Sequence, residues 1–188
     1  MNAPLHPKGH PMKSHYSDAP TAQPVARHTL SVLVDNEPGV LARIAGLFSG
    51  RGYNIESLTV SETEHEQHVS RITIVTAGTN QVIEQIKAHL DRLVPVHRVV
   101  DLTTTGEAIE RELALVKVVG KGDARVEALR LAAAFGARTL DATLTSFVFE
   151  LTGTTEEIER FLRLMAGVGL VEVSRTGIAA MSRGPEPL

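Results

Sequence analysis

Cysteine and tryptophan are both absent from the 188-residue sequence, and only 4% of its residues are aromatic. Without cysteine the chain can form no disulfide, no thiolate metal site and no cysteine nucleophile, which agrees with a reducing compartment. No apolar run reaches the ~20 residues that cross a bilayer, and the first residues lead into no apolar segment of the kind found in a secretory signal. We therefore predict a cytoplasmic protein with no membrane partner.

Positive charge is not in excess either. The formal net charge is −3, so the chain lacks the basic field that would hold a phosphate backbone, and we expect no nucleic-acid partner. With 43% hydrophobic and 22% charged residues, the composition is that of an ordinary globular protein.

The N-terminal segment differs in composition from the rest of the chain. It contains five prolines and few large apolar side chains, so it buries too little surface to offset the entropy lost on ordering. We predict a disordered tail at residues 1–27. Its histidines share no helix face and have no carboxylate cluster beside them, so we expect no metal there. These histidines are His6, His10 and His15.

Periodic patterns begin at residue 28. The alternation of Leu30, Val32 and Val34 predicts a half-buried strand. The patterns that follow predict a helix, two strands, a helix and a strand, in that order, at residues 40–49, 54–61, 69–76, 80–93 and 96–102. Asn36 is the expected N-cap of the first helix. The order is βαββαβ, and we assign residues 28–105 to one domain.

The same order of elements follows a second time. Strand patterns occur at residues 113–119, 138–144, 147–152 and 170–174. Asp123 is expected to cap a helix that buries the apolar residues of one face, namely Val126, Leu129 and Ala133. The other helix follows a capping box formed by Thr154 and Glu157. We assign residues 106–180 to a second ferredoxin-like domain and residues 181–188 to a C-terminal tail.

Two βαββαβ units in series predict an α+β fold of two tandem ferredoxin-like domains, each with an antiparallel sheet and both helices on one face. A unit of roughly 75 residues would bury only ~60% of the surface that its unfolded chain exposes, so we expect the chain to recruit partners. RNA-recognition domains share this order but stack bases on sheet aromatics, and the strand predicted at 69–76 contains none.

No set of residues predicts catalysis. Gly120-Lys121-Gly122 is placed like a dinucleotide-binding loop, but Arg125 occupies the third glycine position and no further parallel βαβ unit follows. The sequence has no Gly-x-Ser-x-Gly nucleophile motif. One charged loop holds several acidic residues and histidines, which lack the distinct environments that separate the pKa values of a catalytic pair. We expect these side chains to be solvated: Glu62, Glu64, His65, Glu66 and His68.

The loop at residues 35–40 is the strongest candidate binding site. A helix N-terminus exposes unpaired N–H groups and a partial positive charge, which suit a carboxylate. Asn36 adds an amide that both donates and accepts, and Gly39 allows a ligand to approach the backbone closely. An ordinary capped strand–helix junction would have the same residues, so the motif alone leaves both interpretations open.

A second segment carries a family resemblance. The run Leu-Ser-Val-Leu-Val-Asp-Asn-Glu-Pro-Gly-Val-Leu at 30–41, followed by Gly-Leu-Phe at 46–48 and Arg-Gly-Tyr-Asn-Ile-Glu-Ser-Leu-Thr-Val at 51–60, resembles the acetolactate synthase small-subunit family. The Asn-x-x-Gly-x-Leu spacing marks the broader ACT class of amino-acid sensors, and the longer run is more specific. The resemblance covers residues 28–184, with further matches at residues 70–74, 115–118, 172–177 and 182–184.

The resemblance implies a non-catalytic regulatory subunit. Such a chain would bind the large catalytic subunit, raise its activity and confer feedback inhibition by valine in branched-chain amino acid biosynthesis. Thiamine diphosphate, Mg²⁺ and FAD would be held by the catalytic subunit, and this chain would hold no cofactor. The ACT domain would form a homodimer with the effector between two copies. Carried onto this sequence, the effector-binding residues are Asn36, Gly39, Val40 and Leu41 of one copy, and Asn54 and Ile55 of the other.

Two other classes of function stay open at this point. The chain could be a free-standing ACT-domain sensor that regulates a different amino-acid biosynthetic enzyme, which a pull-down of a thiamine-dependent partner would distinguish. An enzyme in its own right is disfavoured by the missing catalytic residues.

Overall fold

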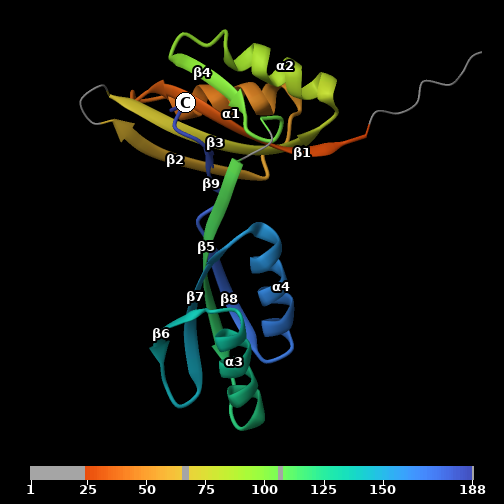
Figure 1. The fold of residues 1–188 in the computed structure, drawn as a ribbon, viewed down its shortest axis with the longest axis vertical. Coiled ribbons are helices and arrows are strands. Elements are labelled where there is room, and N and C mark those ends of the chain that lie inside the picture. Colours follow the sequence, from red (N-terminus) through yellow and green to blue (C-terminus); the bar gives the residue numbers. More distant parts are fainter. Residues whose placement is uncertain (1–23, 65–67, 106–107, 188) are drawn as a thin grey trace, which may run out of the picture.

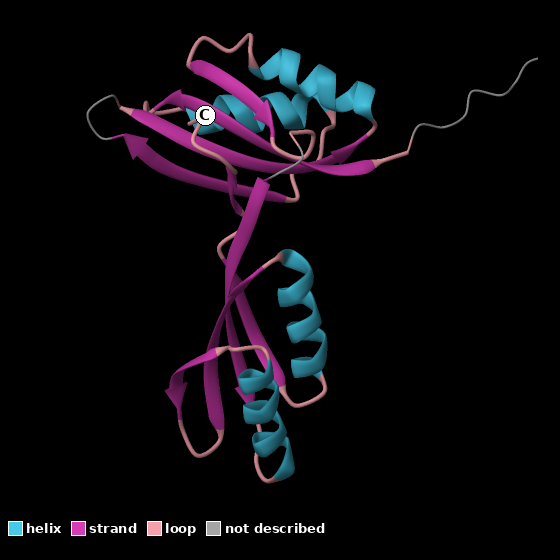
Figure 2. Ribbon diagram, viewed as in Figure 1, coloured by secondary structure: helices cyan, strands magenta, loops and turns pink. Residues whose placement is uncertain are grey.

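The computed structural model describes residues 24–64, 68–105 and 108–187. The predicted α+β fold of two βαββαβ units is confirmed (Figure 1). The elements of the first unit are β1 (Ala26–Asp35), α1 (Val40–Arg51), β2 (Ser57–Glu64), β3 (Val69–Gly78), α2 (Asn80–Leu90) and β4 (Val96–Asp101). Its strands form an antiparallel sheet in the order β2-β3-β1-β4, and α1 and α2 cover one face (Figure 2).

The second unit repeats this arrangement. Its elements are β5 (Ala108–Val119), α3 (Asp123–Ala134), β6 (Arg138–Ala142), β7 (Ser146–Gly153), α4 (Thr155–Ala166) and β8 (Leu170–Arg175). The strand order is β6-β7-β5-β8. A last strand, β9 (Ala179–Ser182), pairs with the first residues of β5 and was not predicted from the sequence pattern. Because β5 extends from the first sheet into the second, the division between residues 105 and 106 stays a prediction (Figure 1).

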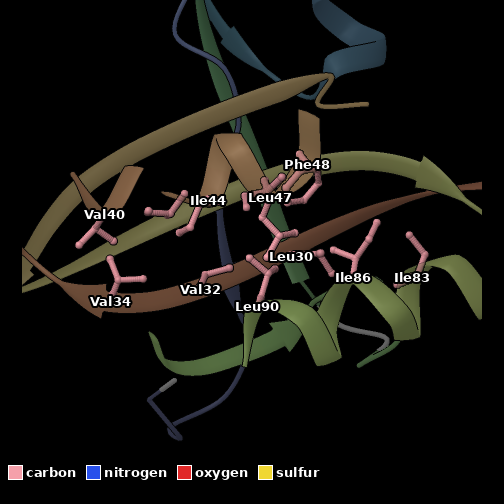
Figure 3. Close-up of a cluster of buried hydrophobic side chains, with 12 residues drawn as sticks. Leu30, Val32, Val34, Val40, Ile44, Leu47, Phe48, Ile83, Ile86 and Leu90 are labelled. Carbon is pink, nitrogen blue, oxygen red and sulfur yellow. The ribbon is translucent and has the colours of Figure 1, made fainter. Parts of the chain in front are cut away.

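The first core follows the two periodicities of the sequence. Alternate residues of β1 face the helices, and each helix contributes residues spaced three or four apart. Figure 3 shows these side chains meeting between the sheet and the two helices. They are Leu30, Val32 and Val34 of β1, Val40, Ile44, Leu47 and Phe48 of α1, and Ile83, Ile86 and Leu90 of α2.

The prediction that Asn36 caps α1 is wrong. Gly39 is the N-cap, with φ 90° and ψ −8°, and no side chain of the described residues caps the helix. Asn36 lies three residues before the N-cap. A side chain that caps a helix stands at the N-cap position, from which it accepts from the N–H groups of the first turn. The Asn36 N–H instead donates to the carbonyl oxygen of His68 at 2.6 Å, which extends the strand ladder of β1.

The predicted buried face of α3 is also wrong. Val126 and Leu129 are 58% and 41% exposed, and the buried residues are Ala128 and Ala132. The helix is rotated so that small side chains contact the sheet, and periodicity alone does not distinguish this rotation from the predicted one. Gly122, rather than Asp123, is the N-cap.

The predicted loop that follows residue 61 is partly strand, because β2 continues to Glu64 and pairs with Val69 across a register shift. Residues 65–67 lie outside the described residues, as does most of the predicted N-terminal tail with its three histidines. The structure describes β1 from Ala26, two residues before the predicted start of the first domain.

The open face of the first sheet is covered by the chain itself. Ile178 and Ala180 are 2% and 7% exposed, and they pack with Val75 of β3 and with Leu102, the residue after β4. This small cluster contains residues that are up to 105 positions apart, from Val75 to Ala180 (180 − 75). Part of the open face is therefore covered by the chain's own C-terminal residues.

Candidate functional site

The first group of predicted site residues lies where β1 ends and α1 begins. Two backbone hydrogen bonds hold the turn, from the Asp35 N–H to the Pro95 carbonyl at 2.9 Å and from the Asn36 N–H to the His68 carbonyl. Asn36 and Gly39 are exposed beyond these bonds. The turn is therefore fixed by its neighbouring strands while its outer surface remains accessible.

Gly39 has two properties that bear on a ligand. Its φ of +90° lies in the left-handed region that favours glycine. A Cβ added at this position would meet nothing within 4 Å, so open space lies beside the backbone. The conformation explains why glycine is used here, and the space leaves room for a ligand.

The N-terminus of α1 is uncapped. Its first turn contains no acidic residue, and no side chain from the described part of the chain accepts from its N–H groups. The first i→i−4 bond of the helix is donated by the Arg43 N–H to the Gly39 carbonyl at 3.0 Å. The Val40 N–H donates to the Glu37 carbonyl at 3.4 Å, which leaves the N–H groups of Leu41 and Ala42 available to an anion at the positive end of the helix dipole.

Apolar side chains adjoin this N-terminus in two different environments. Leu41 is 42% exposed, whereas Val40 is only 3% exposed and belongs to the core. Leu41 therefore has apolar surface that a ligand can contact. Val40 packs in the first core beneath the turn.

The second group of predicted site residues follows the other end of α1. Tyr53 packs edge-on against Phe48, with ring centroids 5.9 Å apart. The Asn54 carbonyl accepts from the Thr76 hydroxyl at 2.6 Å, and its side chain is on the exposed side of the segment. Ile55 is half-buried against the first core. These contacts fix the position of residues 53–55 ahead of β2.

Charged groups flank this second segment. Arg27 forms an ion pair with Glu56 at 3.2 Å. His89 lies beside Tyr53, and its pKa is lowered by partial desolvation and by the nearby charges of Arg51 and Arg92. Partial desolvation and the positive charge of these arginines near Tyr53 therefore disfavour protonation of His89.

The structure does not bring the two groups together within one chain. They lie at opposite ends of α1, whose twelve residues span about 18 Å. We name the two predicted groups by their polar residues: the Asn36 half-site is Asn36, Gly39, Val40 and Leu41, and the Asn54 half-site is Asn54 and Ile55.

The described residues form neither a cluster suited to a metal ion nor a membrane-spanning helix. Within residues 24–64, 68–105 and 108–187, no three His, Asp or Glu side chains are grouped so that they could hold a metal ion. The helices of the same residues are too short or too polar to cross a membrane.

Each of the two units matches a protein-family model. Residues 30–98 match the family model described as "AHAS small subunit-like ACT domain", and residues 111–184 match the one described as "Small subunit of acetolactate synthase". The chain belongs to the acetolactate synthase small-subunit family. The resemblance found in the sequence is thus confirmed, and the alternative of a free-standing sensor is not favoured.

The chain aligns with nearly the whole length of several members of this family. The probable acetolactate synthase small subunit of Archaeoglobus fulgidus is 44% identical over 158 residues, which cover 84% of this chain and 98% of the relative. The isozyme 3 small subunit of Salmonella typhimurium is 45% identical, covering 84% and 96%. The crystal structure of the small subunit from Thermotoga maritima has a TM-score of 0.78 at 36% identity, covering 86% and 99%.

One set of residues near the predicted site was not among the residues predicted from the sequence. Residues 176–182 cross from the second unit onto β2, directly after the Asn54 half-site. The resemblance at residues 172–177 marked part of this segment, but only the fold shows what it contacts.

Proposed function

We propose that this small subunit binds the large catalytic subunit of acetolactate synthase, raises its activity and confers feedback inhibition by valine. The observation that carries the effector assignment is the uncapped N-terminus of α1, which has an open Gly39 backbone beside it. Family membership supports the partner, since each named relative is a small subunit of acetolactate synthase. The chain would work in the cytoplasm.

The proposed effector site contains both half-sites. The valine carboxylate would accept from the N–H groups of α1, while Asn54 and nearby backbone carbonyls would hold the ammonium group. Ile55 and Leu41 would form the surface of the apolar pocket for the branched side chain, and Val40 would shape it from the core beneath. Because the half-sites are about 18 Å apart in one chain, two copies must supply one each. A homodimer through the ACT domain would create two equivalent sites by symmetry.

The chain itself would be non-catalytic and without a cofactor. We expect the purified chain, supplied with pyruvate, thiamine diphosphate, Mg²⁺ and FAD, to form no acetolactate, and to raise turnover when mixed with the large subunit. Calorimetric titration of the chain with valine, leucine and isoleucine tests the effector role separately. Turnover by the chain alone would contradict the regulatory assignment.

Mixed dimers test whether each site is shared between copies. Asn36→Ala and Asn54→Ala should each weaken valine binding by about fivefold to a hundredfold, because a desolvated ligand group loses its partner, worth ~1–3 kcal/mol. Neither change removes a helix cap, so stability should change by less than about 0.5 kcal/mol.

A dimer of one Asn36→Ala copy and one Asn54→Ala copy should regain one site of full affinity. Its other site combines both changes, so calorimetry should show half the wild-type stoichiometry at wild-type affinity. If each site lay within one chain, the mixed dimer would contain no intact site. Weak binding throughout would therefore contradict the shared site.

A further inference from the structure

The two units are connected by a second route besides β5. After β8 the chain leaves the second unit, and residues 176–182, which we name the return segment, lie on the open face of the first sheet (Figure 1). The Ile178 N–H donates to the Ser57 hydroxyl of β2 at 3.1 Å. Ile178 and Ala180 bury their side chains against this sheet.

The return segment is anchored firmly to the second unit at its start. The Thr176 N–H donates to the Leu113 carbonyl at 3.0 Å, and the Leu113 N–H donates back to the Thr176 hydroxyl at 3.1 Å. Arg175 pairs with the carboxylate of Glu112, which is 3% exposed. A displacement of the return segment would therefore be transmitted to β5 and β8.

Gly177 makes the contact with β2 very close. Its φ is +79°, and an added Cβ would lie 2.7 Å from Ser57 Oγ and 2.8 Å from Thr59 Oγ1. Real Cβ atoms do not approach oxygen this closely, so a side chain here would require the Ser57 and Thr59 hydroxyls, or β2 itself, to move. Gly177 thus packs against the hydroxyl side chains of β2 at a distance that only glycine allows.

β2 is in turn continuous with the Asn54 half-site. Only Glu56 separates Ile55 from Ser57, and its N–H donates to the Val75 carbonyl at 2.8 Å. Arg27 joins the same region to the second unit, since it contacts Glu56 at 3.2 Å and Glu110 of β5 at 3.7 Å.

A cavity beside these contacts leaves space for movement. It has a volume of about 630 Å³ and is lined by residues of both units, among them Glu56, Ser57, Glu112, Arg175 and Ile178. The two units therefore contact each other at the return segment, and the cavity lies directly beside this contact.

We propose that the return segment transmits occupancy of the Asn54 half-site to the second unit, with Gly177 and Ser57 as the positioning residues. This inference rests on the proposed effector function. A ligand that orders Asn54 and Ile55 would also order Ser57, to which the Ile178 N–H is bound.

Amide hydrogen exchange of the full-length chain, with and without saturating valine, tests the proposal. In the wild type we expect valine to slow exchange at residues 176–182 by about fivefold or more, the lower end of the coupling usual between linked sites. In Ser57→Ala this slowing should disappear, while the Kd for valine stays within about threefold of wild type. Ser61→Ala, an exposed serine of the same strand, is the matched control and should behave as wild type.

Gly177→Ala gives a second measurement on the complex with the large subunit. We expect its maximal inhibition by valine to fall by about threefold or more, with activation retained. Gly136→Ala controls for backbone strain, because Gly136 has φ +67° but nothing within 4 Å of an added Cβ. Equal effects of the two glycine changes would overturn the role of the Ser57 contact.

Valine binding without any change in exchange at residues 176–182 would overturn the transmission alone. No valine binding by the wild type would overturn the effector site, and the transmission with it.

Discussion

Gly39→Asp is expected to weaken the response to valine strongly while the chain still folds, dimerises and activates the large subunit. Aspartate at an N-cap accepts from the first-turn N–H groups of its own helix. No side chain of the described residues occupies those groups in α1, so the introduced carboxylate would fill the place of the effector carboxylate and repel it. Hydrogen bonds to a charged group are worth about 1.5–3 kcal/mol, so valine affinity should fall by roughly tenfold to a hundredfold.

Gly39→Ala separates this effect from backbone strain. Alanine brings no acceptor and meets nothing within 4 Å, but it shares the unfavourable φ of +90°. We expect it to cost about 1–2 kcal/mol of stability and to weaken valine binding much less than Gly39→Asp does. The measurements are calorimetry on the chain and valine inhibition of the complex. Unchanged valine affinity in Gly39→Asp would show that the effector binds elsewhere.

Arg175→Ala should destabilise the chain far more than the loss of an exposed ion pair. The Glu112 side chain is 3% exposed, and Arg175 holds it with two hydrogen bonds, the Nε bond being 3.0 Å long. Removing the guanidinium leaves a buried carboxylate without its partner, which typically costs about 3–5 kcal/mol. Urea unfolding followed by far-ultraviolet circular dichroism measures the loss.

Arg138→Ala is the matched control for this change. Arg138 pairs with Glu150 at 3.0 Å in the same unit, but its side chain is 70% exposed, so the pair should contribute less than about 1 kcal/mol. The second change Glu112→Gln should restore part of the stability lost in Arg175→Ala, because it removes the buried charge. A loss in Arg175→Ala no larger than that in Arg138→Ala would contradict this account.

Local patterns in the sequence were sufficient for the order of elements within the two βαββαβ units. Alternation along β1 and helical spacing along α4 depend on neighbours within a few residues, so they are visible without the fold. The capping box is equally local: the Thr154 hydroxyl accepts from the Glu157 N–H at 3.3 Å, and the Glu157 carboxylate accepts from the Thr154 N–H at 2.8 Å. The family resemblance was likewise carried by short runs of residues.

The predictions for the N-cap of α1 and for the buried face of α3 were wrong because both features depend on contacts with segments distant in the sequence. Asn36 is an acceptable cap by type, but its N–H is held by His68, so the cap position passes to Gly39. α3 has two possible apolar faces, and packing against the second sheet selects the one with Ala128 and Ala132.

The sequence by itself determined the two βαββαβ units, the family and the identity of the candidate effector residues. The tertiary structure added that the two groups lie at opposite ends of α1, which extends from Val40 to Arg51. It also decided that Ile178 contacts Ser57 across 121 positions of sequence, a contact that no local pattern encodes. Burial of Ile178 and Ala180 on the open face of the first sheet provides the physical reason, since apolar surface is covered wherever the folded chain can reach it.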